Sequence, residues 1–229
     1  MGNSKISIRT DKLTKIFNQG HVETKAVKNV NLKIPKGKFV SILGHSGSGK
    51  TTLLSLIGGL TKPSYGEVII DGVDIWQLKD KELSILRNKK IGFIFQFASL
   101  IPTLNVIDNL VLPTIFSDKK SEDVYERARE LLELVGMEDK IYIYPNQLSG
   151  GQQRKVAITR AFMNNPEIIL ADEPTGDLDE ESETGVMELF LKMNREKGTT
   201  FIMVTHSKKL AMQTAIRFYM KSGVLKRGK

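Results

Sequence analysis

The 229-residue chain contains no cysteine and only three histidines. The absence of thiols excludes disulfides, cysteine nucleophiles and cysteine-based zinc or iron–sulfur sites, and it suits a reducing compartment. The histidines, His21, His45 and His206, are too few and too scattered to indicate a metal cluster. No apolar run approaches the ~18–20 residues that a membrane span requires, and the polar residues 1–10 lack the apolar core of a signal peptide. We therefore expect a cytoplasmic protein that does not itself cross a membrane.

Charge is distributed unevenly along the chain. The net charge is +8, and residues 1–115 hold the whole excess, with 16 basic and 8 acidic side chains. Such an excess fits either an anionic partner or a solvated, lysine-rich sheet edge that resists edge-to-edge aggregation. We favour the sheet edge and expect no nucleic-acid partner, because the lysines are dispersed and are not interleaved with aromatic residues.

The first third of the chain has the pattern of short β-strands. Hydrophobic residues make up 40% of the chain, enough to bury a core. Residues 27–34 alternate in polarity, and residues 68–70 run into Asp71-Gly72, a strong hairpin-turn signal. The apolar run 39–43 has the length of a buried strand and stops at a glycine-rich loop, after which residues 52–57 predict a helix.

The rest of the chain predicts helices and buried strands. Apolar residues at helical spacing predict one helix from Ser121 to about Val135, and a second from Gly150 to Asn164. Two apolar runs, 168–171 and 200–204, predict strands that flank a helix over 180–195. A helix that connects two strands, both of them apolar, implies an α/β fold with a mostly parallel sheet.

The glycine-rich loop after the apolar run 39–43 fits the phosphate-loop pattern in full. Its glycines allow backbone N–H groups to surround phosphates at a helix N-terminus. Lys50 can reach the β- and γ-phosphates, and the Thr51 hydroxyl can ligate Mg²⁺. A chance Gly/Ser turn is disfavoured because the loop lies between a strand and a helix, and we interpret His45 as a spacer. The candidate ATP-binding residues are Gly44, His45, Ser46, Gly47, Ser48, Gly49, Lys50, Thr51 and Thr52.

Two adjacent acids end the apolar run 168–171. Ligands bind at the carboxyl ends of strands in parallel sheets, and neighbouring side chains point to different sides of a strand. Asp172 would therefore hold Mg²⁺, while Glu173 would face the attacking water as general base. A plain turn is the alternative interpretation, and the phosphate loop upstream disfavours it.

A third motif, Leu148-Ser149-Gly150-Gly151-Gln152, offers a second anion site. Ser149 can cap a helix whose first N–H groups are left open by two glycines. With this motif the sequence resembles the nucleotide-binding subunit of an ATP-binding-cassette (ABC) transporter over nearly the whole chain. The resemblance implies an α/β, RecA-like ATPase core with an N-terminal antiparallel β portion and a helical subdomain, and it implies ATP and Mg²⁺ as cofactors.

The resemblance also implies roles for particular residues. Phe17 would stack on adenine, with a core phenylalanine as the alternative, and Gln96 would contact Mg²⁺ and the water and sense the membrane partner. His206 would contact the γ-phosphate and position Glu173, and the residues from Leu148 to Gln152 would close over the γ-phosphate held by the opposite subunit. Asp177 and Asp179 would lie at the dimer interface. The sequence departs from the family at His45, where proline is common, and at Gln153-Arg154-Lys155, where Gln-Gln-Arg is frequent.

We expect one ABC ATPase domain over residues 1–229. Its β portion and core would occupy 1–87, its helical subdomain about 88–165, and the rest of the core 166–229. Residues 96–113 and 171–179 resemble the lipoprotein-release, macrolide-export and cell-division branch, which implies an exporter or extractor. Two copies would form an ATP sandwich that drives an integral membrane permease on a separate chain, at the cytoplasmic face of the cell membrane. The alternative is a mechanoenzyme that regulates a membrane or cell-wall complex without transport.

Overall fold

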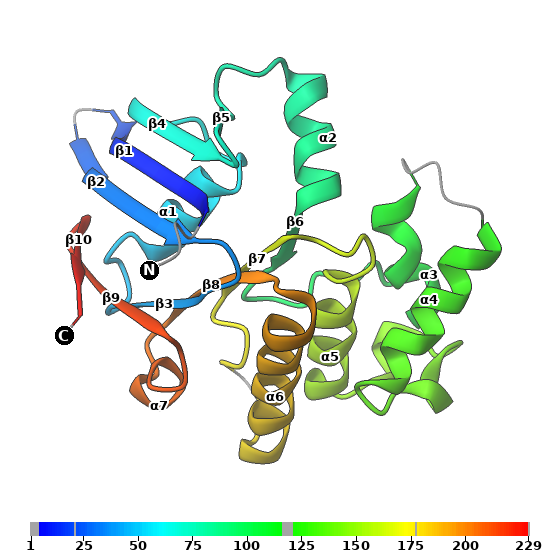
Figure 1. Cartoon of the computed structure of the whole chain (residues 1–229). Helices are drawn as coiled ribbons and strands as arrows, with labels where there is room; N and C mark the ends of the chain where they lie inside the picture. The colour runs from blue at the N-terminus through cyan, green and yellow to red at the C-terminus, as the bar shows by residue number, and fades with distance from the viewer. Residues whose placement is uncertain (1–4, 21, 116–120, 177, 229) are drawn as a thin grey trace.

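The computed structural model describes residues 5–20, 22–115, 121–176 and 178–228, and the strands of this part form two sheets (Figure 1). The smaller sheet is antiparallel, and its two long strands pair along most of their length. Its order is β2-β1-β4-β5, with β1 at Ile6–Gln19, β2 at Val22–Pro35, β4 at Tyr65–Ile70 and β5 at Val73–Asp74.

The larger sheet is mostly parallel, as the apolar strand runs predict. Its order is β10-β9-β3-β8-β7-β6, and only β10 runs antiparallel to its neighbour. Every residue of β3, β7 and β8 is buried, because both faces of the sheet are covered. The bounds are β3 Phe39–Leu43, β6 Ile91–Ile94, β7 Ile168–Asp172, β8 Thr200–Thr205, β9 Ile216–Lys221 and β10 Val224–Arg227.

Helices cover the larger sheet on one face, and the smaller sheet lies on the other side (Figure 1). None of the helices in the described ranges is long and apolar enough to span a bilayer. The α-helices are α1 Lys50–Ile57, α2 Asp80–Lys90, α3 Val106–Val111, α4 Ser121–Glu133, α5 Gly150–Arg160, α6 Glu180–Lys197 and α7 Lys208–Ala211, and short 3₁₀ turns lie at Leu112–Thr114, Glu138–Lys140 and Pro145–Gln147.

The central strands divide their side chains between two apolar cores. Ile169 and Phe201 point into the core that α3, α4, α5 and α6 cover. Their neighbours Ile168 and Ile202 point into the other core, which contains α1 and the inner face of the smaller sheet. This alternation follows from the two-residue period of a strand and fixes the sheet between its two layers.

The structure agrees with most of the local predictions and differs at two places. Asp71 and Gly72 have φ of 49° and 88°, as a two-residue hairpin turn between β4 and β5 requires. Helix α5 ends at Arg160, so the prediction of a helix to Asn164 was wrong. The N–H groups of residues 161–163 turn back to carbonyls three residues earlier, which tightens the chain and ends the helix. Strand β6 lies within the range expected for the helical subdomain, yet it pairs with β7 in the larger sheet.

Candidate active site

Several of the predicted site residues meet at the carboxyl ends of three adjacent strands of the larger sheet. The phosphate loop follows β3, Asp172 ends β7, and His206 follows β8, which lies between them. A cavity of about 740 Å³ opens at these strand ends. Its lining includes these predicted residues: Ser46, Gly47, Ser48, Gly49, Lys50, Thr51, Thr52, Gln96, Asp172, Glu173 and His206.

The phosphate loop requires glycine for two reasons: its backbone adopts positive φ angles, and neighbouring backbone lies too close to leave room for a Cβ. Gly47 and Gly49 have φ of 73° and 101°, a region that side chains disfavour. A Cβ on Gly49 would lie 2.1 Å from the carbonyl oxygen of Ala26, and one on Gly44 would lie 2.4 Å from that of Met220. No side chain caps the N-terminus of α1, so its N–H groups remain available to an anion.

Lys50 begins α1 and folds back over the loop that precedes it. Its ammonium donates to the carbonyl oxygens of Gly44 at 2.8 Å and His45 at 3.2 Å. The same nitrogen lies 3.8 Å from a carboxylate oxygen of Glu173, and its side chain is 8% exposed. His45 contributes its backbone carbonyl to this contact.

Two buried oxygens in the cavity fit a bound cation and phosphates. Oδ1 of Asp172 and Oγ of Ser48 are buried and have no hydrogen-bond partner among the described residues. Burial raises the pKa of Asp172 above its ordinary value, and a hydrogen bond from Thr51 opposes that shift. Carboxylate and hydroxyl oxygens are ligands that Mg²⁺ prefers, so this donor set fits the ion.

Glu173 is held in position by the strand next to its own. Its φ is 42°, and its N–H donates to the carbonyl oxygen of Val204 at 3.0 Å. Oε2 lies 3.0 Å from Nδ1 of His206 and accepts from the His206 backbone N–H at 3.3 Å. The Glu173 side chain is 14% exposed, so it reaches the cavity while its two oxygens are directed by Lys50 and His206.

Other predicted residues lie elsewhere. Phe17 is 41% exposed with the Lys15 ammonium 5.0 Å from its ring centre, and it is not among the described residues that line the cavity, so adenine stacking stays a prediction. Ser149 caps α5 as predicted, through a reciprocal pair of bonds with Gln152. Asp179 caps α6, and bonds from Ser182 lower its pKa. Asp177 lies outside the described residues.

The motif at 148–152 is also absent from the described lining of this chain's own cavity. Two segments that the sequence reasoning missed do line it: residues 23–26 with Lys28 near the start of β2, and the Ser222-Gly223 turn between β9 and β10. The Gly223 N–H donates to the Ser48 carbonyl at 2.9 Å, and the Gly223 carbonyl accepts from the Lys28 N–H at 2.8 Å. The excess of lysine in residues 1–115 was the available signal for the first segment, and the Ser222-Gly223 turn had none.

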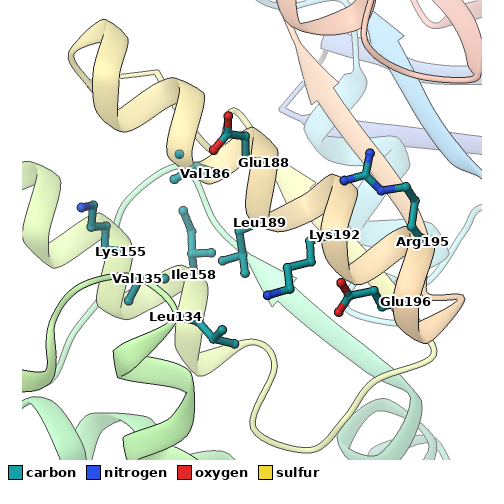
Figure 2. Close-up of a pocket in the computed structure, with 11 residues that line it drawn as sticks. Leu134, Val135, Lys155, Ile158, Val186, Glu188, Leu189, Lys192, Arg195 and Glu196 are labelled. Atoms are coloured by element: carbon teal, nitrogen blue, oxygen red, sulfur yellow. The ribbon is translucent and has the colours of Figure 1, made fainter.

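A second hollow lies apart from this site, between α6, α5 and the residues that directly follow α4 (Figure 2). Its volume is about 520 Å³, and its lining contains none of the predicted site residues that the structure describes. Apolar side chains form its floor, while charges of both signs surround it, with Lys155 on α5 and Arg195 on α6 at opposite ends (Figure 2).

A strand–loop–helix phosphate cradle beside two acids at the edge of a parallel sheet defines a P-loop nucleoside triphosphatase. The sequence profile of the ABC transporter family matches residues 27–176. The chain is 46% identical over 224 residues to the uncharacterized ABC transporter ATP-binding protein MJ0796 of Methanocaldococcus jannaschii, covering 96% of this chain and 95% of that one. The chain belongs to the ABC transporter family and is an ATP-binding, ATP-hydrolysing cassette.

Other relatives agree with this assignment. An uncharacterized ABC transporter ATP-binding protein of Thermotoga maritima is 46% identical over 193 residues, which cover 84% of this chain and 82% of that one. The dimeric, post-hydrolysis structure of the MJ0796 cassette bound to ADP and Pi superposes with a TM-score of 0.90 at 44% identity, over 96% and 98% of the two chains. The structure of the cbiO1 protein of Clostridium perfringens, part of the ABC transporter complex cbiONQ, superposes with a TM-score of 0.85 at 28% identity. The superposition covers 98% of this chain and 88% of that one.

The unpartnered Asp172 oxygen leads to a prediction about stability. At neutral pH the ionised carboxylate of Asp172 destabilises the nucleotide-free fold, because burial raises its pKa above the unfolded value. We expect Asp172→Asn to raise the melting temperature without nucleotide by about 2–4 °C, the effect of about 1 kcal/mol in a chain of this size. Magnesium-dependent ATP turnover should fall by at least about 100-fold.

The sign of the effect can be checked with pH. The destabilisation by Asp172 exists only where the carboxylate is ionised, so the melting temperatures of Asp172→Asn and wild type should converge as the pH falls through the raised pKa. Calorimetry between pH 4 and 8 measures this difference. A variant that is less stable than wild type at neutral pH would contradict the prediction.

Proposed function

We propose that two copies of this chain form an ATP sandwich, which hydrolyses ATP and drives an integral membrane permease on a separate chain. The observation that carries the proposal is that the predicted ATP-binding residues of one chain lie in two separate places. The phosphate loop, Asp172, Glu173 and His206 share a cavity, whereas the motif at 148–152 is not among the described residues that line it. A second copy, facing the first head to tail, would supply that motif to the open side of the cavity.

Each residue in the cavity has a separate part in the proposed reaction. The backbone N–H groups of the phosphate loop and Lys50 bind the phosphates. Thr51, Asp172 and Gln96 would hold Mg²⁺, which when bound neutralises charge on the β- and γ-phosphates. Glu173 accepts a proton from the attacking water, and we assign to His206 the orientation of the Glu173 carboxylate.

The partner copy completes the phosphate cradle. Ser149 caps α5, and Gly150 and Gly151, whose N–H groups point out of the helix N-terminus, belong to its first turn. Their partial positive charge would stabilise the γ-phosphate of the facing subunit. Asp177 and Asp179 would lie at this interface, and Asp179 orders the start of α6 through its bonds to Ser182.

The permease would dock near Gln96. Phe95 and Phe97, on either side of it, are 46% and 72% exposed, and such aromatic exposure is typical of a protein contact. A hollow of about 460 Å³ beside Phe95 includes Leu60 and Leu112 and could receive a short element of the permease. We infer that the dimer acts at the cytoplasmic face of the membrane, and the branch resemblance favours an exporter or extractor.

Isolation of the chain from its own cells in mild detergent tests this function. We expect a polytopic membrane protein to co-purify and ATP turnover to require Mg²⁺. Phe97→Ser should release the membrane protein while the basal turnover stays within about twofold of wild type, because Phe97 is a surface side chain. Turnover stimulated by nucleic acid, without a membrane partner, would contradict the proposal.

A further inference from the structure

Arg154 is a buried arginine on the helix that begins with the 148–152 motif. Its side chain lies in α5 and the residue is 4% exposed. The guanidinium donates to the carbonyl oxygen of Phe95 at 2.6 Å and to that of Gln96. The same group lies 3.5 Å from the carbonyl oxygen of Glu173. One side chain therefore contacts the backbone of both residues that we place around the attacking water.

Arg160 repeats this contact at the other end of α5. Its guanidinium donates to the carbonyl oxygens of Ala98 and Ser99, each at 3.1 Å. Residues 95–99 form neither helix nor strand, so their carbonyls need partners from elsewhere. Arg154 and Arg160, here called the arginine clamp, together satisfy four of the five carbonyls between Phe95 and Ser99 and hold this segment against α5.

The clamp uses chemistry that is particular to arginine. A guanidinium presents five N–H donors in a rigid plane and keeps its charge, so a single side chain can bridge several carbonyl oxygens. A lysine would keep the charge but concentrate it at one point. A small hollow of about 170 Å³, lined by residues that include Gln96, Phe97 and Gly150, lies where segment 95–99 meets the start of α5.

We propose that Arg154 is a positioning residue for hydrolysis, which holds Gln96 and Glu173 in a fixed relation to the helix that carries the 148–152 motif. The proposal rests on the proposed function, since it concerns the same reaction. Movement of the permease surface around Gln96 would then reach Glu173 through one guanidinium.

Three variants test the proposal in the full-length protein. Arg154→Lys keeps the charge and Arg154→Gln removes it, while Arg195→Gln makes the same change on the exposed surface of α6 (Figure 2). We expect both Arg154 variants to lose about 10-fold in ATP turnover, because misplacing catalytic groups by a fraction of an ångström has effects of this size, while ATP affinity changes less than about threefold. Arg195→Gln should match wild type in both measurements.

Hydrogen exchange gives a readout that does not depend on turnover. In nucleotide-free protein, amides in segment 95–99 should exchange faster in both Arg154 variants than in wild type or Arg195→Gln, while amides of β3 and β8 should not change. If ATP affinity and stability fall by as much as ATP turnover in the Arg154 variants, the proposal is overturned. Failure of wild type to hydrolyse ATP would instead refute the proposed function, and the exchange result would still report on the clamp.

A double-mutant cycle with Gln96→Ala separates positioning from general stability. If Arg154 acts by placing Gln96, then Arg154→Gln should reduce turnover by less than about threefold in the Gln96→Ala background, against about 10-fold in wild type. Two losses that multiply independently would overturn the placing of Gln96 by Arg154, and normal turnover in the single Arg154→Gln variant would overturn the whole proposal.

Discussion

Glu173→Gln is expected to reduce ATP turnover by about 10²–10⁴-fold while leaving ATP binding intact, since a positioned general base contributes an acceleration of this order. Glutamine has nearly the same shape, so its amide oxygen can keep the contact with His206 that holds the side chain at 3.0 Å. It cannot accept the proton from water at neutral pH. The variant should therefore remain a dimer after ATP is added, whereas wild type returns to monomer as it hydrolyses the nucleotide.

Phosphate release measures the turnover, and light scattering coupled to gel filtration measures the dimer. Glu188→Gln provides a matched control, because Glu188 is exposed on α6 and lies at the second hollow, away from the cavity (Figure 2). Turnover of Glu173→Gln within about threefold of wild type would show that another group takes the proton and would remove Glu173 from this role.

Mixing two inactive variants should restore ATP turnover. Ser149→Arg places a long cation where the partner's γ-phosphate would bind, and Lys50→Ala removes the ammonium that reaches the phosphates. Each homodimer then has two defective sites. A mixed dimer has one intact site, made of the phosphate loop from the Ser149→Arg chain and the 148–152 motif from the Lys50→Ala chain. With random pairing and independent sites, about one quarter of the wild-type turnover should return.

The restoration identifies which chain supplies each half of the site. If the 148–152 motif acted on its own chain's nucleotide, no combination of these two variants would contain an intact site, and the mixture would stay inactive. Ser149→Asp is the control for folding, because aspartate caps a helix about as well as serine does but repels phosphate. It should give the same restoration in the mixture, with α5 as stable as in wild type.

Local chemistry made much of the fold predictable. The apolar run 39–43 is a buried strand, and the turn at Asp71-Gly72 needs two residues of positive φ, which this pair readily adopts. The end of α5 was predicted too late because the next residue that must stop a helix is Pro166, whereas the chain already changes to three-residue hydrogen bonds after Arg160. Strand β6 has only four residues and carries no turn signal of its own, so only its pairing with β7 distinguishes it from the helices around it.

The candidate nucleotide site could be predicted from the sequence alone, because the proposed phosphate cradle is a contiguous segment. Gly44 to Thr51 contain the flexible backbone, the ammonium and the hydroxyl that phosphates and Mg²⁺ require, at a spacing that any strand–loop–helix connection would display. The two acids after residues 168–171 were identifiable for the same reason. Each of these motifs is local and does not depend on distant partners.

Tertiary structure alone decided how these pieces act on one another. The order β3-β8-β7 places Lys50 3.8 Å from Glu173, although 123 positions separate them, and puts His206 beside the same carboxylate. It also brings Arg154 against the carbonyls of Phe95 and Gln96, and sets the Gly223 turn under the phosphate loop. The physical reason is that each of these contacts joins two segments that lie far apart in the sequence. Whether such segments meet depends on the order of the strands and the packing of the helices, which neither segment records by itself.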